Sequence, residues 1–171
     1  MEYIGFMTTP NSEELVCCPK FEPSVLDNKT HQWENKPFIK ETMRTFLHMP
    51  WPPAIGRLME KMWKIAKDND AYPAPVDFLM LAYDPTPWRC EYYMAVTKEV
   101  PGAENVKMSG TFMSKVFEGP YSAVPKWIKE MNKYVETAGK KVKKHYFYYT
   151  TCPKCAKKNG HNYVVAFTEV E

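Results

Sequence analysis

The sequence predicts an α+β fold, in which a strand-helix-strand-strand module occurs twice and builds one antiparallel sheet with two long helices. The first observation is composition: the 171 residues are 44% hydrophobic and 25% charged, which is typical of one globular domain and excludes wholesale disorder. The second is that strand-like and helix-like patterns follow the same order in both halves of the chain. The third is agreement in register, since the Pro-Trp at residues 50–51 recurs as Pro-Tyr at 120–121, and residues 92–97 recur as 163–168.

Three strands and one helix are expected in the first half of the chain. Residues 1–36 are expected to form an irregular segment packed on the domain, because prolines interrupt every candidate element there. Over residues 38–49, β-branched, aromatic and charged residues mix as in a half-exposed strand. A helix ending near Asp68 follows, because its apolar residues recur at helical spacing. Strands are then predicted at residues 78–83 and 91–97, separated by a turn that contains two prolines.

The second half repeats this order of elements. A strand at residues 110–118 leads into a Gly-Pro-Tyr turn. A helix is predicted next, because its apolar residues fall on one face: Val124, Trp127, Ile128, Met131, Tyr134, Val135 and Ala138. Gly139 is placed to end that helix in the left-handed conformation. Two further strands, at residues 145–151 and 163–170, are expected on either side of a loop.

A single module of this kind has too few elements to bury its own sheet face. The halves, residues 37–100 and 106–171, are therefore expected to form one domain over residues 37–171, related by a pseudo-twofold axis. Their junction would leave a concavity lined by both halves, which is a usual place for a small-molecule site.

The segment Lys-Val-Phe-Glu-Gly-Pro-Tyr at residues 115–121, the long helix after it and the closing strand resemble the GyrI-like small-molecule-binding domain family. This family includes the ligand-sensing modules of multidrug-responsive regulators and stand-alone proteins. The resemblance implies an aromatic pocket for bulky compounds, often cationic or planar, and some members hydrolyse strained xenobiotics. The chain departs from the family pattern at Phe117, where members commonly have His, and at Phe147, where several members have Glu.

Aromatic residues make up 15% of the chain and supply the candidate ligand-binding set. Their flat faces suit planar or cationic ligands through stacking and cation–π contacts of about 0.5–2 kcal/mol each. The set expected around a cleft between the halves is Trp51, Trp63, Trp88, Tyr121, Trp127, Phe147 and Tyr149. The alternative is that these side chains belong to an ordinary hydrophobic core.

Two carboxylates are candidates for catalysis in a hydrolase that acts on a reactive xenobiotic. Glu169 follows the apolar strand in period with Val165 and Phe167, so a buried Glu169 would be a general base or a cation partner. Glu91, at the start of its strand, is a weaker candidate of the same kind. In this alternative one of them activates water and Tyr149 or Tyr121 orients it. The other interpretation of Glu169 is a solvated residue near the C-terminus.

The pair Cys152 and Cys155 has the C-x-x-C spacing of two zinc ligands. Cys17 or Cys18, together with His161, are the candidates for completing a four-ligand site, which gives a third alternative, a zinc-stapled interaction protein. Plain reduced thiols and redox chemistry remain open beside it. A thioredoxin-like motif is not favoured, because the pair is expected in a loop between strands and not at a helix start.

The expected function is a stand-alone protein that binds hydrophobic, aromatic or cationic small molecules, without a cofactor unless zinc is bound. The net charge of +3 is too balanced to indicate a nucleic-acid partner, and no helical arm for DNA binding is expected before the domain. No apolar run approaches the roughly 18 residues of a membrane span, and no signal peptide is visible, so a cytoplasmic monomer or homodimer is expected.

Overall fold

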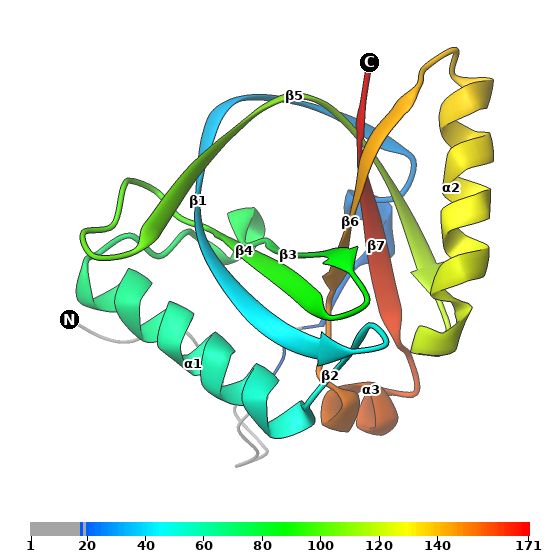
Figure 1. Ribbon diagram of the computed structural model, residues 1–171. Coiled ribbons are helices and arrows are strands. Elements are labelled where there is room, and N and C mark those ends of the chain that lie inside the picture. Colours follow the sequence, from blue (N-terminus) through cyan, green and yellow to red (C-terminus); the bar gives the residue numbers. More distant parts are fainter. Residues whose placement is uncertain (1–17, 19) are drawn as a thin grey trace.

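The computed structural model describes residue 18 and residues 20–171, as one curved sheet with helices on its outer side (Figure 1). The strands are β1 (Lys29–Phe46), β2 (Met49–Pro50), β3 (Met80–Thr86), β4 (Arg89–Ala95), β5 (Glu104–Glu118), β6 (Val142–Tyr149) and β7 (Tyr163–Val170). The α-helices are α1 (Pro52–Asp68), α2 (Val124–Thr137) and α3 (Pro153–Asn159), and short 3-10 turns occupy Pro23–Val25, Pro75–Asp77 and Tyr121–Ala123. The predicted α+β class and antiparallel sheet are therefore confirmed.

The sheet curls into a barrel-like form because β1, near one end of the strand order, also pairs with β5 at the other end. The strand order is β2-β1-β4-β3-β6-β7-β5, every pairing is antiparallel, and β1 also pairs with β5. In β1 the register shifts between Trp33 and Lys36, where Asn35 has a positive φ of 51°. Such a bulge bends a strand and increases its twist. The curved strands leave a concave inner face that one flat sheet would lack (Figure 1).

Residues 29–36 correct the sequence-based expectation, because they form the first part of β1 and not an irregular segment. Their pairing runs from Lys29 opposite Ser114 to Lys36 opposite Met108. Most side chains in this part of the strand are exposed. The segment therefore lacks the apolar alternation by which a strand is predicted from sequence. The partner β5 supplies the backbone hydrogen bonds instead.

Three clusters of buried side chains form the core. The face of α1 with Met62 and Ala66 packs on the outer side of β1, β3 and β4, and the face of α2 with Trp127 and Met131 packs on the outer side of β5 to β7. The third cluster fills part of the inner side, and its largest fully buried members are Phe38, Phe112, Phe167 and Leu81.

The two halves show the predicted order of elements: β1-α1-β3-β4 and then β5-α2-β6-β7. They differ in their additions, since β2 occurs in the first half and α3 in the second. The duplication and the pseudo-twofold relation stay predictions. Across the described residues, the helices are too short or too polar to span a membrane.

Candidate functional site

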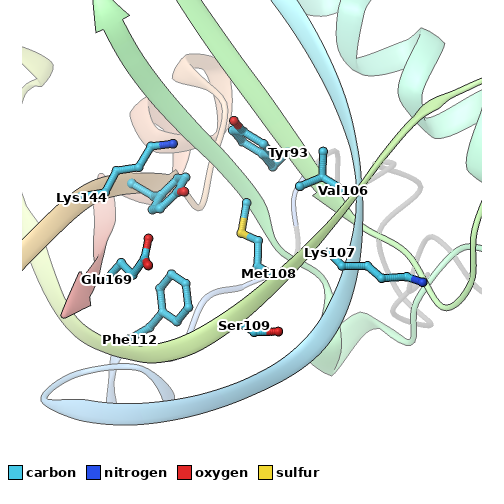
Figure 2. Close-up of a pocket in the computed structure, with 9 residues that line it drawn as sticks. Tyr93, Val106, Lys107, Met108, Ser109, Phe112, Lys144 and Glu169 are labelled. Atoms are coloured by element: carbon cyan, nitrogen blue, oxygen red, sulfur yellow. The ribbon is translucent and has the colours of Figure 1, made fainter. Parts of the chain in front are cut away.

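A pocket of about 260 Å³ opens on the inner side of the sheet, where β4 faces β5, β6 and β7 (Figure 2). Its lining combines aromatic and apolar groups with the charged side chains of two lysines and a glutamate. The lining residues are Tyr93, Val106, Lys107, Met108, Ser109, Phe112, Lys144, Tyr146 and Glu169. The pocket follows from the curvature of the sheet, because alternate residues of each strand point inward. Its volume is just under the range of about 300–1,000 Å³ for ligand pockets, so a small ligand fits it best.

Lys144 places its ammonium group among tyrosine rings at one end of the pocket. Its Nζ atom lies 3.8 Å from the ring centroid of Tyr83, 4.9 Å from that of Tyr146 and 5.9 Å from that of Tyr93. All three distances lie within the approximately 6 Å range of a cation–π interaction. Burial lowers the pKa of Lys144, and the nearby carboxylates of Glu91 and Glu169 offset only part of that effect. We call Tyr83, Tyr93 and Tyr146 the tyrosine cage.

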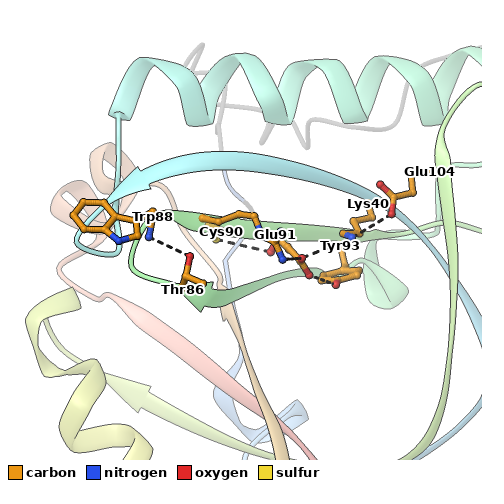
Figure 3. A network of polar contacts seen from close by, with 8 residues as sticks. Lys40, Thr86, Trp88, Cys90, Glu91, Tyr93 and Glu104 are labelled. Atoms are coloured by element: carbon orange, nitrogen blue, oxygen red, sulfur yellow. Dashed lines mark hydrogen bonds and ion pairs between the residues drawn. The ribbon is translucent and has the colours of Figure 1, made fainter.

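Glu91 is buried behind the cage and is held by three partners (Figure 3). The hydroxyl of Tyr93 donates to its Oε2 at 2.5 Å, and Arg89 donates to its Oε1 at 3.0 Å. Lys40 lies 3.7 Å away and also binds Glu104 at 3.1 Å. Burial by itself raises the pKa of Glu91, but the Tyr93 hydrogen bond and the positive charges of Lys40 and Arg89 hold it below its ordinary value.

Glu169 is the second carboxylate of the site, and it points into the pocket toward Lys144 and Phe112 (Figure 2). Lys143 binds its Oε1 at 2.8 Å. Burial is the main cause that raises the pKa of both Tyr93 and Tyr146, so these tyrosines stay protonated at neutral pH. The site therefore holds the ammonium group of Lys144 among neutral rings, and the carboxylates of Glu91 and Glu169 favour its charged form.

The predicted ligand-binding residues lie elsewhere, and none of them lines this pocket. Trp51 and Trp88 are 72% and 55% exposed, and Trp63 packs against Tyr72 with ring centroids 5.0 Å apart. Phe147 and Tyr149 lie on the outer side of the sheet, where they pack in one cluster with Trp127 of α2. Tyr121, just before α2, is 43% exposed, and its ring is in edge contact with that of Tyr149 at 5.2 Å.

The predicted catalytic residues are divided between the two sides of the sheet. Glu169 lines the pocket and Glu91 reaches it through Tyr93, but Tyr149 packs with the outer clusters. The pairing of Glu169 with Tyr149 therefore has no geometric basis. Tyr93 and Tyr146 are the tyrosines that line the pocket together with Glu169. The alternation in β6 could have revealed this, because Lys144 and Tyr146 are two residues apart and share a face.

The predicted cysteine cluster is partly assembled. The Sγ atoms of Cys18, Cys152 and Cys155 all lie within 4.8 Å of one another, whereas Cys17 is outside the described residues. The expected position of the C-x-x-C pair in a loop is wrong, because Cys152 is the N-cap of α3. The pair thus lies at a helix start, and the argument against redox chemistry from its position does not hold. His161 instead bonds Glu118 at 2.7 Å and stacks on Tyr163.

Comparison with known proteins gives one family and several solved structures of the same fold. The family model described as "Bacterial hydrolase" matches residues 8–170. No curated protein matches the chain.

The solved structures are similar in fold over most of the chain but distant in sequence. The EcmrR C-terminal domain is 11% identical, with a TM-score of 0.63, and the match covers 85% of this chain and 97% of that one. A hydrolase from Listeria innocua is 12% identical, with a TM-score of 0.60 and coverage of 85% and 92%. SAV2435 bound to tetraphenylphosphonium is 13% identical, with a TM-score of 0.50 and coverage of 85% and 94%. These solved structures therefore agree with the sequence-based resemblance at the level of the fold.

Proposed function

The chain belongs to the bacterial hydrolase family, and we propose that it binds small aromatic cations in the pocket between β4 and β5 to β7. The observation that carries this proposal is the place of Lys144. Its ammonium lies over the Tyr83 ring at 3.8 Å, and the negative charges of Glu91 and Glu169 favour its charged form. A site that accommodates an ammonium group of the chain itself has the chemistry to receive one from a ligand.

The aromatic and apolar walls define the rest of the ligand. Phe112 and Met108 lie beside the cage and offer surfaces for an aromatic ring. Tyr93 and Tyr146 stay neutral, so their ring faces remain attractive to a cation. The fold is shared with SAV2435, whose solved structure contains the organic cation tetraphenylphosphonium, and this supports the same ligand class here.

Lys144 also makes the proposal specific, because a ligand cation must displace its ammonium from the cage. The carboxylates already have basic partners, Glu169 with Lys143 and Glu91 with Arg89. A ligand therefore gains mainly from the rings and from burial of its apolar groups. We expect modest affinity in the natural chain and tighter binding when Lys144 is removed.

The test is calorimetric titration with benzyltrimethylammonium and with tetraphenylphosphonium. Lys144→Ala should raise the affinity for benzyltrimethylammonium about 2- to 30-fold, the equivalent of a cation–π contact of about 0.5–2 kcal/mol. Lys140→Ala is the control, since Lys140 is an exposed lysine just before β6. Weaker cation binding in Lys144→Ala, or no binding of either cation to any variant, would contradict the proposal.

A second candidate function is hydrolysis in the same pocket, and the description of the matched family favours it. Glu169 would accept a proton from a water molecule that attacks a strained or otherwise reactive xenobiotic. Tyr146, which lines the same pocket, would orient the substrate. In Glu169→Gln, turnover should be lost while binding persists, and Tyr149→Phe should leave both unchanged because Tyr149 packs on the other side.

A further inference from the structure

Three thiols from two distant parts of the chain meet where α3 begins. Cys18 precedes the first strand, and Cys152 and Cys155 stand one helical turn apart at the start of α3. Their Sγ atoms lie within 4.8 Å of one another. The pocket described above involves none of these residues, so the cluster has no role in the proposed ligand binding.

From this geometry we infer that Cys18, Cys152 and Cys155 bind one zinc ion. Zinc bonds to thiolate sulfur at about 2.3 Å in a tetrahedral arrangement, which separates two ligand sulfurs by about 3.8 Å. The three Sγ atoms, all within 4.8 Å of one another, lie at most about 1 Å beyond that spacing. Zinc takes four ligands, so a water molecule or a further donor completes the shell.

Backbone hydrogen bonds already orient two of the sulfurs. The N–H of Cys152 donates to Sγ of Cys18 at 3.3 Å, and the N–H of Cys155 donates to Sγ of Cys152 at 3.5 Å. Such bonds favour the thiolate form, because they place partial positive charge beside the sulfur. They also fix the directions of the ligands, as the surroundings of metal ligands commonly do.

Charge and ligand type both favour a divalent, thiophilic ion. Three thiolates with one Zn²⁺ leave a net charge of −1, and Lys154 and Lys157 on α3 are basic residues close by in sequence. A set of sulfur donors excludes magnesium and calcium, which prefer oxygen.

The consequence is a cross-link between the segment at Cys18 and the hairpin that carries α3. The two sites are 134 residues apart in sequence. Because the sulfurs come together only in the folded chain, the free energy of metal binding adds to the stability of the fold.

The test is elemental analysis of the full chain, purified under reducing conditions without a metal-affinity step. We expect about one zinc per chain, as for a structural zinc site, and loss of the metal in each of Cys18→Ser, Cys152→Ser and Cys155→Ser. Cys90→Ser is the matched control, because Cys90 is buried in the separate core cluster under α1 and should leave the zinc content unchanged.

A second measurement uses the natural chain, so its result does not depend on whether the cysteine variants fold. Titration of the natural, metal-stripped and reduced chain with Co²⁺ should give the absorption bands of thiolate-bound tetrahedral cobalt. Less than about a tenth of a zinc per chain together with no cobalt bands would overturn the inference, since a site of this type retains its metal tightly. A native disulfide between two of the three cysteines, detected by thiol titration before reduction, would overturn it as well.

Discussion

The hydroxyl of Tyr93 donates a 2.5 Å hydrogen bond to Oε2 of Glu91, two residues earlier on the same face of β4. Tyr93→Phe removes this bond and keeps the ring. We expect a loss of about 1.5–3 kcal/mol in the free energy of unfolding, as for a hydrogen bond to a charged group. We also expect the pKa of Glu91 to rise, because that bond holds the pKa down. Denaturant titration tests the first effect and carboxyl NMR the second. An unchanged pKa of Glu91 would show that Lys40 and Arg89 hold it down without the Tyr93 hydrogen bond.

Glu91 should also make the stability of the protein depend on pH. Its pKa is lower in the folded chain than the ordinary value, so the folded state binds fewer protons than the unfolded state around that pKa. The stability it contributes is present above the unfolded pKa of about 4.3 and is lost as the pH falls through the folded pKa. Glu91→Gln should therefore be destabilising at pH 7 and much less so at pH 3. Equal losses at both values would exclude this linkage.

Trp127 is a residue whose substitution should change stability and not ligand binding. It is 4% exposed, and its ring stacks on Phe117 with centroids 5.6 Å apart and planes 18° apart. Trp127→Ala should cost about 3–5 kcal/mol of unfolding free energy because it empties part of the core under α2. Trp51→Ala, at a 72% exposed position, should stay within about 0.5 kcal/mol. A folded Trp127→Ala that specifically loses cation binding would place the ligand site under α2 instead.

The helices and most strands could be predicted from sequence because their burial is periodic. The spacing that ends at Ala66 and the one that runs from Trp127 to Val135 each define one buried helix face. The pocket could not be predicted from sequence, because it depends on which face of each strand points inward once β1 pairs with β5. Tyr146 and Phe147 are neighbours in sequence and equally aromatic, yet only Tyr146 lines the pocket. Sequence periodicity shows that the faces differ but not which one the sheet encloses.

Gly119, in the Gly-Pro-Tyr motif, has a structural reason for being glycine. Its φ is +145°, and a Cβ added there would lie 3.4 Å from Cζ2 of Trp127. Gly119→Ala should be destabilising by about 1–3 kcal/mol because the backbone conformation is strained for other residues. Gly56→Ala is the matched control: Gly56 lies within α1 with nothing within 4 Å of its added Cβ, so a gain of about 0.5–1 kcal/mol is expected. Thermal unfolding of both variants tests whether Gly119→Ala lowers the stability and Gly56→Ala raises it.

Mild acidification should lower the stability of the fold, because His145 and His31 resist protonation in the folded chain. Burial is the main cause that lowers the pKa of both, with Lys36 adding to the effect at His31. His145 is held between Oγ1 of Thr168 at 2.7 Å and Oδ1 of Asn132 at 2.8 Å.

Because their folded pKa values are lowered, the unfolded chain binds protons first as the pH falls. The stability that these histidines contribute is therefore complete above the unfolded pKa of about 6.5, and it is lost as the pH falls through their folded pKa values. Urea titrations at pH 7.5 and pH 5.5 should show lower stability at pH 5.5. His145→Gln and His31→Gln should each reduce that difference, and the double variant should reduce it most. A double variant with the same pH dependence as the natural chain would show that other groups cause it.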